Sequence, residues 1–417
     1  MALDDAHRAA ERVARESYGR LIALLAGRTH DVAGAEDALG DAFAAALRTW
    51  PADGVPGNPD AWLLTAARRR QTDVIRRRQV RTAAEEQVKL IVNEIEAMAD
   101  QRDAIPDRRL ALMFACAHPA IDPAMRTPLI LQTILGLTAE DIASAFLVSP
   151  ATMGQRLVRA KTRIRDAGIP FRVPDQEELP ERLAAVLDAI YAAYTKGWNE
   201  VSGDGISELA DEAIWLGELT VSLLPDEPEA KGLLALMLYT TARRATRYDA
   251  AGTFVPLERQ DTNLWERPLI ARAEHHLNQA NAAGPSGRYQ IEAAIQSAHV
   301  ARRLTGVANW AAVVALYDHL FALTGSPVVI LNRAVARAEL DGPHAALADL
   351  APLESDKRMF AYQPYWAARG HLLSLAGDTA SAAQALTVAI GLTTDKAEKG
   401  YLSARLASLQ GDPRTQT

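Results

Sequence analysis

Apolar residues recur three and four positions apart along nearly the whole chain, and this spacing limits what it can fold into. Val13, Leu21 and Leu25 show it near the start, and residues 183–194 show it again after the middle. This period is that of an amphipathic helix, and no long stretch shows the two-residue alternation of a strand. Aromatic residues are only 6% of the 417 residues, whereas alanine, the strongest helix former, is abundant. The sequence therefore predicts an all-α fold.

Composition and charge exclude several classes of protein. Hydrophobic residues make up 49% and charged residues 23% of the chain, which suits two or three packed domains. The apolar runs are too short to span a bilayer and the first residues lack a signal-peptide pattern, so we expect a soluble, cytoplasmic protein. The single cysteine, Cys116, excludes an intramolecular disulfide and a Cys-rich zinc site. Because the net charge is −7, any DNA contact must come from local clusters.

Helix breakers and acidic residues divide the chain. An acidic linker is predicted at 82–105 and a second linker at 169–179, which leaves domains at 1–81, 106–168 and 180–417. In the last domain, Gly342 and Gly377 lie 35 residues apart with matching neighbours. That spacing is close to the period of tetratricopeptide-type helical hairpins. Such a stack buries the apolar face of each hairpin on the next one and leaves a groove for a partner.

Residues 138–161 carry the sharpest local pattern. Thr138 and Asp141 have the spacing of a capping box, and Ser149 followed by Pro150 is typical of the start of a second helix. Two short helices joined this tightly predict a helix-turn-helix, and the basic residues of 156–165 make a plain helical hairpin the weaker alternative. The second helix would point polar and cationic side chains outward, namely Thr152, Gln155, Arg156 and Arg159.

Two more segments have helical patterns with charges. Pro59 opens a helix that is predicted to turn Trp62 inward, and seven arginines between 68 and 81 accompany one acid, Asp73. Alone, such a run is a solvated face as often as a phosphate-binding one, but beside a helix-turn-helix a second DNA-contacting surface is the better interpretation. The segment 35–43 surrounds apolar helix positions with three acids, Glu36, Asp37 and Asp41.

These three segments, in this order, resemble a bacterial sigma factor of the extracytoplasmic-function class of the sigma-70 family. The resemblance implies two small helical sigma domains, regions 2 and 4, that bind core RNA polymerase and promoter DNA. The implied polymerase-binding residues are Glu36, Asp37, Asp41 and Phe43. Those for the minus-ten box are Trp62, Arg68, Arg69, Arg70, Asp73, Arg76 and Arg77. Those for the minus-thirty-five box are Thr152, Gln155, Arg156, Arg159 and Lys161. The acids of the 82–105 linker would either mimic nucleic acid in the polymerase channel or serve as a tether.

Residues 180–417 resemble the C-terminal tetratricopeptide-like extension of one subgroup of these factors. We expect the extension to regulate activity through an intramolecular contact or a regulatory protein. Within it, Arg243, Arg244 and Arg247 either hold the polar loop at 258–265 in place or form a pocket for an anionic effector. The adjacent pair His275 and His276 lacks the spacing of a helical metal site.

The sequence therefore predicts a transcription initiation factor that catalyses no covalent chemistry. Nucleotide-binding, zinc-protease and serine-hydrolase motifs are absent, so we expect no catalytic residues, no metal and no cofactor. One alternative is a ligand-responsive helix-turn-helix regulator with a tetratricopeptide-like sensor domain, and another is a repeat scaffold. The first domain discriminates between them, because a simple regulator needs neither an acidic clamp-binding helix nor a second basic surface.

Overall fold

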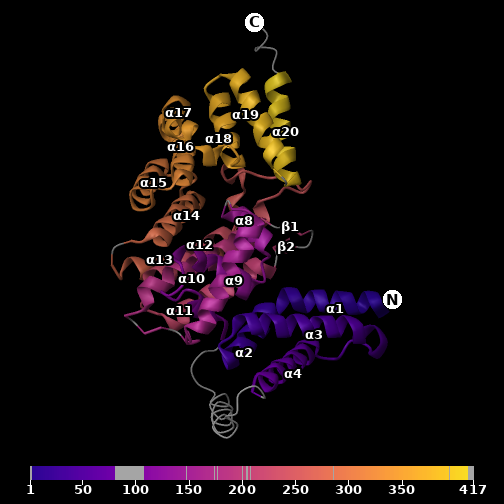
Figure 1. Ribbon diagram of the computed structural model, residues 1–417. Coiled ribbons are helices and arrows are strands. Elements are labelled where there is room, and N and C mark those ends of the chain that lie inside the picture. The colour runs from indigo at the N-terminus through magenta and orange to yellow at the C-terminus, as the bar shows by residue number, and fades with distance from the viewer. Residues whose placement is uncertain are drawn as a thin grey trace. The chain divides into compact units, whose positions relative to one another are not determined.

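The computed structural model describes residues 2–79, 108–146, 148–172, 174–175, 177–199, 201–202, 205–206, 208–284, 286–393 and 395–411. Helices dominate these residues, which confirms the predicted all-α fold class (Figure 1). The chain forms two compact units, Met1–Leu216 and Gly217–Thr417. The predicted acidic linker at 82–105 lies outside the described residues.

Four helices at the start of the first unit form what we call the N-terminal bundle. They are α1 (Ala2–Glu16), α2 (Tyr18–Thr29), α3 (Val32–Asp53) and α4 (Pro59–Gln79). The helical repeat of apolar residues places Leu21, Leu39 and Leu63 in a common core, where all three are fully buried. Side-chain caps fix two of the helix starts, because Asp31 accepts from the Gly34 N–H and Asn58 from the Ala61 N–H.

The next four helices form the helix-turn-helix block. They are α6 (Arg108–Cys116), α7 (Pro123–Leu135), α8 (Ala139–Ala145) and α9 (Pro150–Asp166). The predicted capping box is confirmed, since the Asp141 N–H donates to the Thr138 hydroxyl and the Thr138 N–H donates to the Asp141 carboxylate, each at 3.1 Å. Ser149 caps α9 by accepting from the Thr152 N–H at 3.2 Å. The sequence thus sets both helix starts locally.

Helix α10 (Leu179–Asn199) extends the first unit beyond this block. It packs on α7, where Arg126 donates to the Glu181 carboxylate at 3.0 Å and Thr127 to the Ala185 carbonyl at 3.4 Å. Two short antiparallel strands, β1 (Val201–Ser202) and β2 (Gly205–Ile206), follow, and then α11 (Glu208–Leu223). The first compact unit ends within α11, and α10 belongs to that unit. The strand pair was not foreseen.

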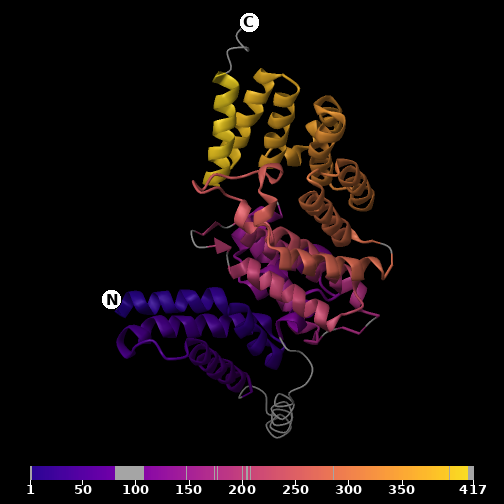
Figure 2. The ribbon, with the colours of Figure 1, turned by 180° about the vertical axis from the view of Figure 1, so that it is seen from behind.

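The second unit is a stack of helices, most of which pack on the next one along the chain (Figures 1 and 2). They are α12 (Pro228–Thr241), α13 (Arg267–Asn281), α14 (Arg288–Thr305), α15 (Trp310–Thr324), α16 (Pro327–Asp341), α17 (Pro343–Leu350), α18 (Gln363–Leu375), α19 (Thr379–Leu392) and α20 (Lys396–Gly411). Short 3₁₀ turns occur at Arg244–Thr246, Leu257–Arg259, Thr262–Leu264, Ala351–Ser355 and Lys357–Met359. The glycines of the 35-residue spacing, Gly342 and Gly377, both turn the chain between two helices with positive φ, 89° and 86°.

The polar loop before α13 is held on the second unit by several side-chain hydrogen bonds. Arg302 donates to the Gln260 carbonyl at 3.3 Å, and the Trp265 ring N–H donates to the Thr246 hydroxyl at 3.1 Å. Arg243 donates to the Gln296 side chain at 2.6 Å. The contacts favour the interpretation of a fixed loop over that of an effector pocket.

Acid is expected to destabilise the second unit through His299. This ring is 9% exposed, and burial together with the Arg243 and Arg302 cations lowers its pKa from 6.5 to about 4. Because the unfolded chain takes up a proton here first, stability falls as the pH falls through this window. Between about pH 7 and about pH 5 the loss from this one group is about 2 kcal/mol. Urea unfolding of wild type and His299→Gln at both pH values checks this, and an equal pH dependence of the two proteins contradicts it.

Candidate DNA and polymerase interfaces

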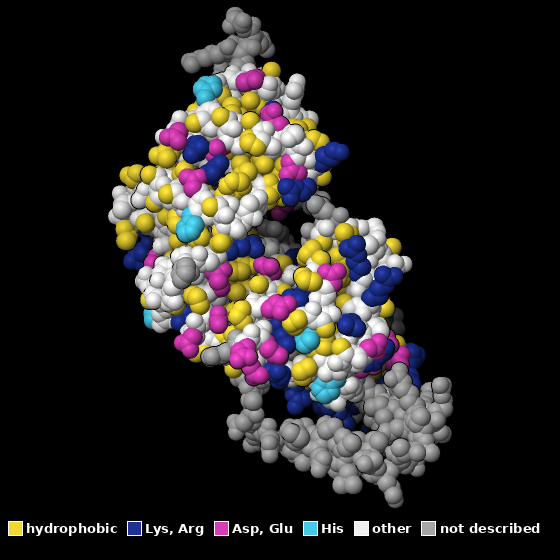
Figure 3. Space-filling view, turned by 60° about the vertical axis from the view of Figure 1, so that its left-hand side comes forward, with side chains coloured by type: hydrophobic (Ala, Val, Ile, Leu, Met, Phe, Trp, Pro, Cys, Tyr) yellow, Lys and Arg dark blue, Asp and Glu magenta, His cyan; other side chains and the backbone are white. Residues whose placement is uncertain are grey.

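One face of α9 presents a row of polar and cationic side chains. Its opposite face is buried through Met153, Leu157 and Ile164. Four of the five residues predicted to read the minus-thirty-five box lie on the outer face, with Thr152 half-buried and the other three exposed: Gln155, Arg156 and Arg159. On the face of the molecule in Figure 3, basic and acidic side chains are interspersed.

Lys161 is the fifth predicted residue of α9, and it lies elsewhere. Its ammonium group forms an ion pair with the Glu36 carboxylate of α3, and the two side chains are only 9% and 17% exposed. Glu36 is itself one of the residues predicted to bind polymerase. In this arrangement the two side chains pair with each other, and both are largely buried.

The remaining predicted polymerase-binding residues lie along α3. Asp37 and Asp41 are exposed one helical turn apart, and Phe43 is half-buried. Asp41 pairs weakly with Arg70 of α4 at 3.6 Å, and both side chains are at least half exposed. Exposed pairs of this kind contribute little to stability, so Asp41 can exchange partners at small cost.

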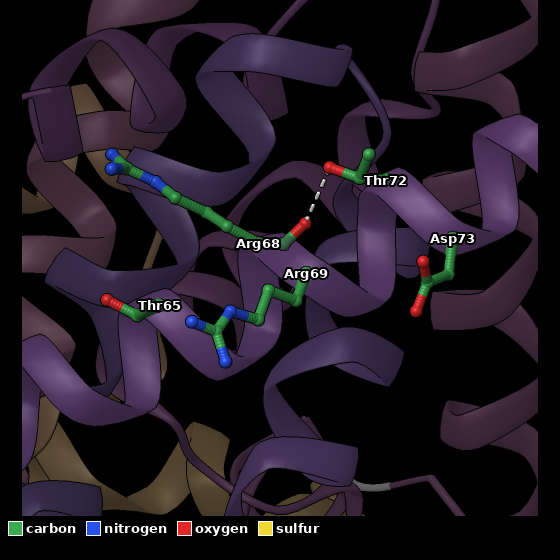
Figure 4. Close-up of a pocket in the computed structure, with 5 residues that line it drawn as sticks. All are labelled: Thr65, Arg68, Arg69, Thr72 and Asp73. Carbon is green, nitrogen blue, oxygen red and sulfur yellow. Dashed lines mark hydrogen bonds between the residues drawn. The ribbon is translucent and has the colours of Figure 1, made fainter.

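A hollow of about 320 Å³ opens on α4 within the segment predicted for the minus-ten box. Thr65, Arg68, Arg69, Thr72 and Asp73 line it (Figure 4). These positions recur at helical spacing, so they share one face. The Thr72 hydroxyl donates to the Arg68 carbonyl at 2.9 Å, while the two guanidinium groups leave the helix in different directions (Figure 4).

The hollow has a positive electrostatic environment. Burial lowers the pKa of Arg68, and the Arg28 and Arg108 cations lower it further. A guanidinium that is destabilised by neighbouring cations is stabilised by an anion, so this part of the bundle suits a phosphate group. Arg28 and Arg108 come from α2 and α6, and nothing in the sequence placed them beside α4.

Other predicted residues of the minus-ten surface divide into three cases. Trp62 packs edge-on against Trp50 with ring centroids 5.5 Å apart. Part of the Trp62 ring surface is therefore used for packing within the bundle. Arg70 is exposed beside Asp41. The side chains of Arg76 and Arg77 lie outside those that the structure describes. Thr65 and Thr72 were not predicted. Thr65 lies three residues before Arg68, and Thr72 lies seven residues after Thr65, so helical spacing could have placed both on the same face as Arg68.

The described residues do not support a metal site, a membrane-spanning helix or a reactive thiol. No cluster of three His, Cys, Asp or Glu side chains there could hold a metal ion, and no described helix is long and apolar enough to cross a membrane. Cys116 is fully buried beside the Thr133 hydroxyl, and burial raises the pKa of its thiol to about 12. The thiol is therefore protonated and unreactive at neutral pH.

Comparison with known proteins places these helices in a family. Residues 13–81 match sigma-70 region 2, and residues 182–281 match a family of unknown function, DUF6596. The uncharacterized protein R00370 of Rhizobium meliloti (strain 1021) is 40% identical over 387 residues, which cover 91% of each chain. No solved structure matches. Because the region 2 match spans most of the N-terminal bundle, including α4 and its hollow, the chain belongs to the sigma-70 family of sigma factors and carries a C-terminal extension.

Proposed function

We propose that this sigma factor belongs to the extracytoplasmic-function class and directs core RNA polymerase to promoters through two separate DNA-contacting surfaces. The observation that carries the proposal is the match to region 2 over the helices that form the α4 hollow, combined with a second, exposed cationic row on α9. A simple regulator needs only the second of these. The factor would act in the cytoplasm and leave the synthesis of RNA to the polymerase.

The N-terminal bundle would contact both polymerase and the melted strand. Asp37 and Asp41 stand on the exposed face of α3, where a basic coiled coil could pair with them. Arg68 and Arg69 would hold phosphates while the hollow between Thr65 and Asp73 receives a base that is flipped out of the strand. Single-stranded bases expose edges that can be read without a groove.

Helix α9 would read duplex DNA in the major groove. Its start is fixed by the Ser149 cap, and residues near the start of a recognition helix contact base edges. Gln155 can pair with adenine, and Arg156 and Arg159 with guanine or phosphate. The extension would regulate these activities, with its helical stack as a protein-binding surface.

Reconstituted transcription tests the proposal. Core polymerase with a random-sequence duplex library should yield transcripts with shared upstream boxes only when the full chain is added. The double variant Asp37→Arg/Asp41→Arg should lose binding to core polymerase, because repulsion replaces attraction, while it still binds duplexes that carry the selected minus-thirty-five box. Sequence-specific duplex binding without any binding to core polymerase would support the ligand-responsive regulator instead.

A further inference from the structure

Three helices of the second unit carry an arginine at the same register. Arg333 of α16, Arg369 of α18 and Arg405 of α20 follow one another at intervals of 36 residues. The first two each bind an acid that lies 15 residues earlier in the chain. Arg333 donates to the Asp318 carboxylate at 2.8 Å, and Arg369 donates to the Glu354 carboxylate at 2.5 Å. These two helices therefore use their arginines in the same way, to bind a carboxylate of the segment before them.

The acid is missing at the third arginine. The residue 15 positions before Arg405 is Ile390, which packs in an apolar cluster of α19 and α20. Among the described residues, Arg405 has no ion pair with an acid, and its guanidinium donates to the Nδ1 atom of His371 at 2.8 Å and to the Tyr401 hydroxyl at 3.3 Å. Because a guanidinium can only donate, Nδ1 must accept, so this imidazole is neutral. Neither partner balances the charge of the arginine.

Arg259, from the loop before α13, is a second cation near the same imidazole. Its side chain is exposed and has no ion pair with an acid in the part of the chain that the structure describes. Burial, together with the Arg405 and Arg259 cations, lowers the pKa of His371 from 6.5 to about 4. Phe254 of the same loop packs edge-on against Tyr401 with ring centroids 5.7 Å apart, so the loop lies beside the start of α20 (Figures 1 and 2). Two guanidinium groups without acids thus lie near one neutral ring.

The acids at the start of α20 have other partners. The Asp395 carboxylate accepts from the Glu398 N–H at 2.8 Å and caps the helix. The Glu398 carboxylate accepts from the Thr393 hydroxyl at 3.3 Å. Neither acid forms an ion pair with the two guanidinium groups, so their positive charge is available to an anion from outside the chain.

We propose that Arg259, Arg405 and Tyr401 form a binding site for an acidic segment of a partner protein. In the complex, an Asp or Glu carboxylate of the partner would take the place that Asp318 and Glu354 have beside the two preceding arginines. A guanidinium suits this role because it can bind a carboxylate through two parallel N–H···O bonds. The proposal deepens the proposed role of the extension as a protein-binding surface, since it names the site and the chemistry of the partner.

The charges of the stack favour a protein carboxylate over a nucleic acid. A nucleic acid binds to a row of cations that follows its phosphates. The arginines of the preceding helices cannot extend such a row, because Arg333 and Arg369 are already bound to acids. Two cations near one ring match one or two carboxylates better than they match a phosphate chain.

A peptide screen with the full chain provides the test. A random hexapeptide array probed with the purified protein should enrich Asp or Glu at one position. Fluorescence anisotropy then measures the affinity of the best peptide for each variant. Arg405→Ala and Arg259→Ala should each weaken binding about tenfold, as expected for the loss of a hydrogen bond to a charged group. Arg369→Ala is the matched control, because Glu354 already balances that charge, and it should bind the peptide as wild type does.

A second pair of variants restores the missing acid. Ile390→Glu places a carboxylate at the register of Asp318 and Glu354, where it should bind Arg405 within the chain and compete with the peptide. Ile390→Gln has the same length without the charge and should leave peptide binding intact. This pair keeps the test decisive if Arg405→Ala does not fold by circular dichroism.

Three results would overturn the proposal. They are an array without enrichment of acids, equal peptide affinities for Arg405→Ala and Arg369→Ala, and equal affinities for Ile390→Glu and Ile390→Gln. An oligothymidylate that loses as much affinity in Arg405→Ala as the peptide does would also overturn it, because the site would then take phosphate. The peptide assay contains neither polymerase nor promoter DNA, so a failure here is distinguishable from a failure of the proposed function in transcription.

Discussion

A fragment that ends after Pro174 is expected to lose the fold of its helix-turn-helix block, whereas one that ends after Leu224 keeps it. The shorter fragment lacks α10, which buries Leu183, Val186, Leu187, Ile190 and Tyr194. Full burial of one large apolar side chain contributes about 1.5 to 3 kcal/mol, so the sum is comparable with the roughly 5 to 15 kcal/mol that stabilise a whole domain. The longer fragment also keeps α11, whose Glu212 pairs with Arg109 of α6.

Urea unfolding followed by circular dichroism, together with limited proteolysis, distinguishes the two fragments. Equal unfolding midpoints, with α7 equally protected from protease, would show that α10 is dispensable for the block.

Because it keeps α10, the fragment ending after Leu224 is the proper form for asking whether the extension regulates transcription. We expect its transcript yield to differ from that of the full chain, and the same yield from the same promoters would argue against a regulatory role.

Replacing both Arg156 and Arg159 with alanine is expected to weaken promoter duplex binding by about 10²-fold to 10⁴-fold. Each guanidinium is exposed on the outer face of α9, and loss of one base or phosphate contact costs about 1 to 3 kcal/mol. Fluorescence anisotropy of the full chain with the selected minus-thirty-five duplex measures the effect. A loss confined to one base position indicates direct readout, while a uniform loss with a smaller salt slope indicates phosphate contact.

Arg165→Ala is the matched control for this pair. Arg165 is exposed and lies nine residues beyond Arg156, so it points to the other side of the same helix, where it pairs with Asp166 at 3.2 Å. It should change binding only slightly, through the overall charge. If the double variant and this control bind equally well, α9 does not enter the groove.

Local patterns were predictable from the sequence, and long-range ones were not. The caps at Thr138 and Ser149 and the inner and outer faces of α9 follow from interactions three and four residues apart. The contact between Glu36 and Lys161 depends on how two bundles dock, and no periodicity encodes that. Docking is also why Arg28 and Arg108, from α2 and α6, were not foreseen beside Arg68.

Helix α10 also shows that long-range packing could not be predicted from the sequence. Its apolar stripe was evident at 183–194, but a stripe specifies only that some partner covers it and not which one. In the structure, α7 is one of the helices that cover it. A composition break such as 169–179 indicates where a chain turns, and it does not indicate which helices the following helix packs on.

The cap at the start of α9 has a consequence for how promoter bases would be discriminated. The Thr152 hydroxyl lies 2.8 Å from the Ser149 hydroxyl, so its direction is set before any DNA arrives. Arg156 and Arg159 are long and exposed, and ordering each one on binding costs about 0.5 to 1.5 kcal/mol of conformational freedom. If α9 reads DNA as proposed, a base opposite Thr152 would therefore meet a rigid template that rejects misfits sharply. Bases opposite the arginines would meet adaptable side chains that tolerate related sequences, so one recognition helix would combine a strict position with permissive ones.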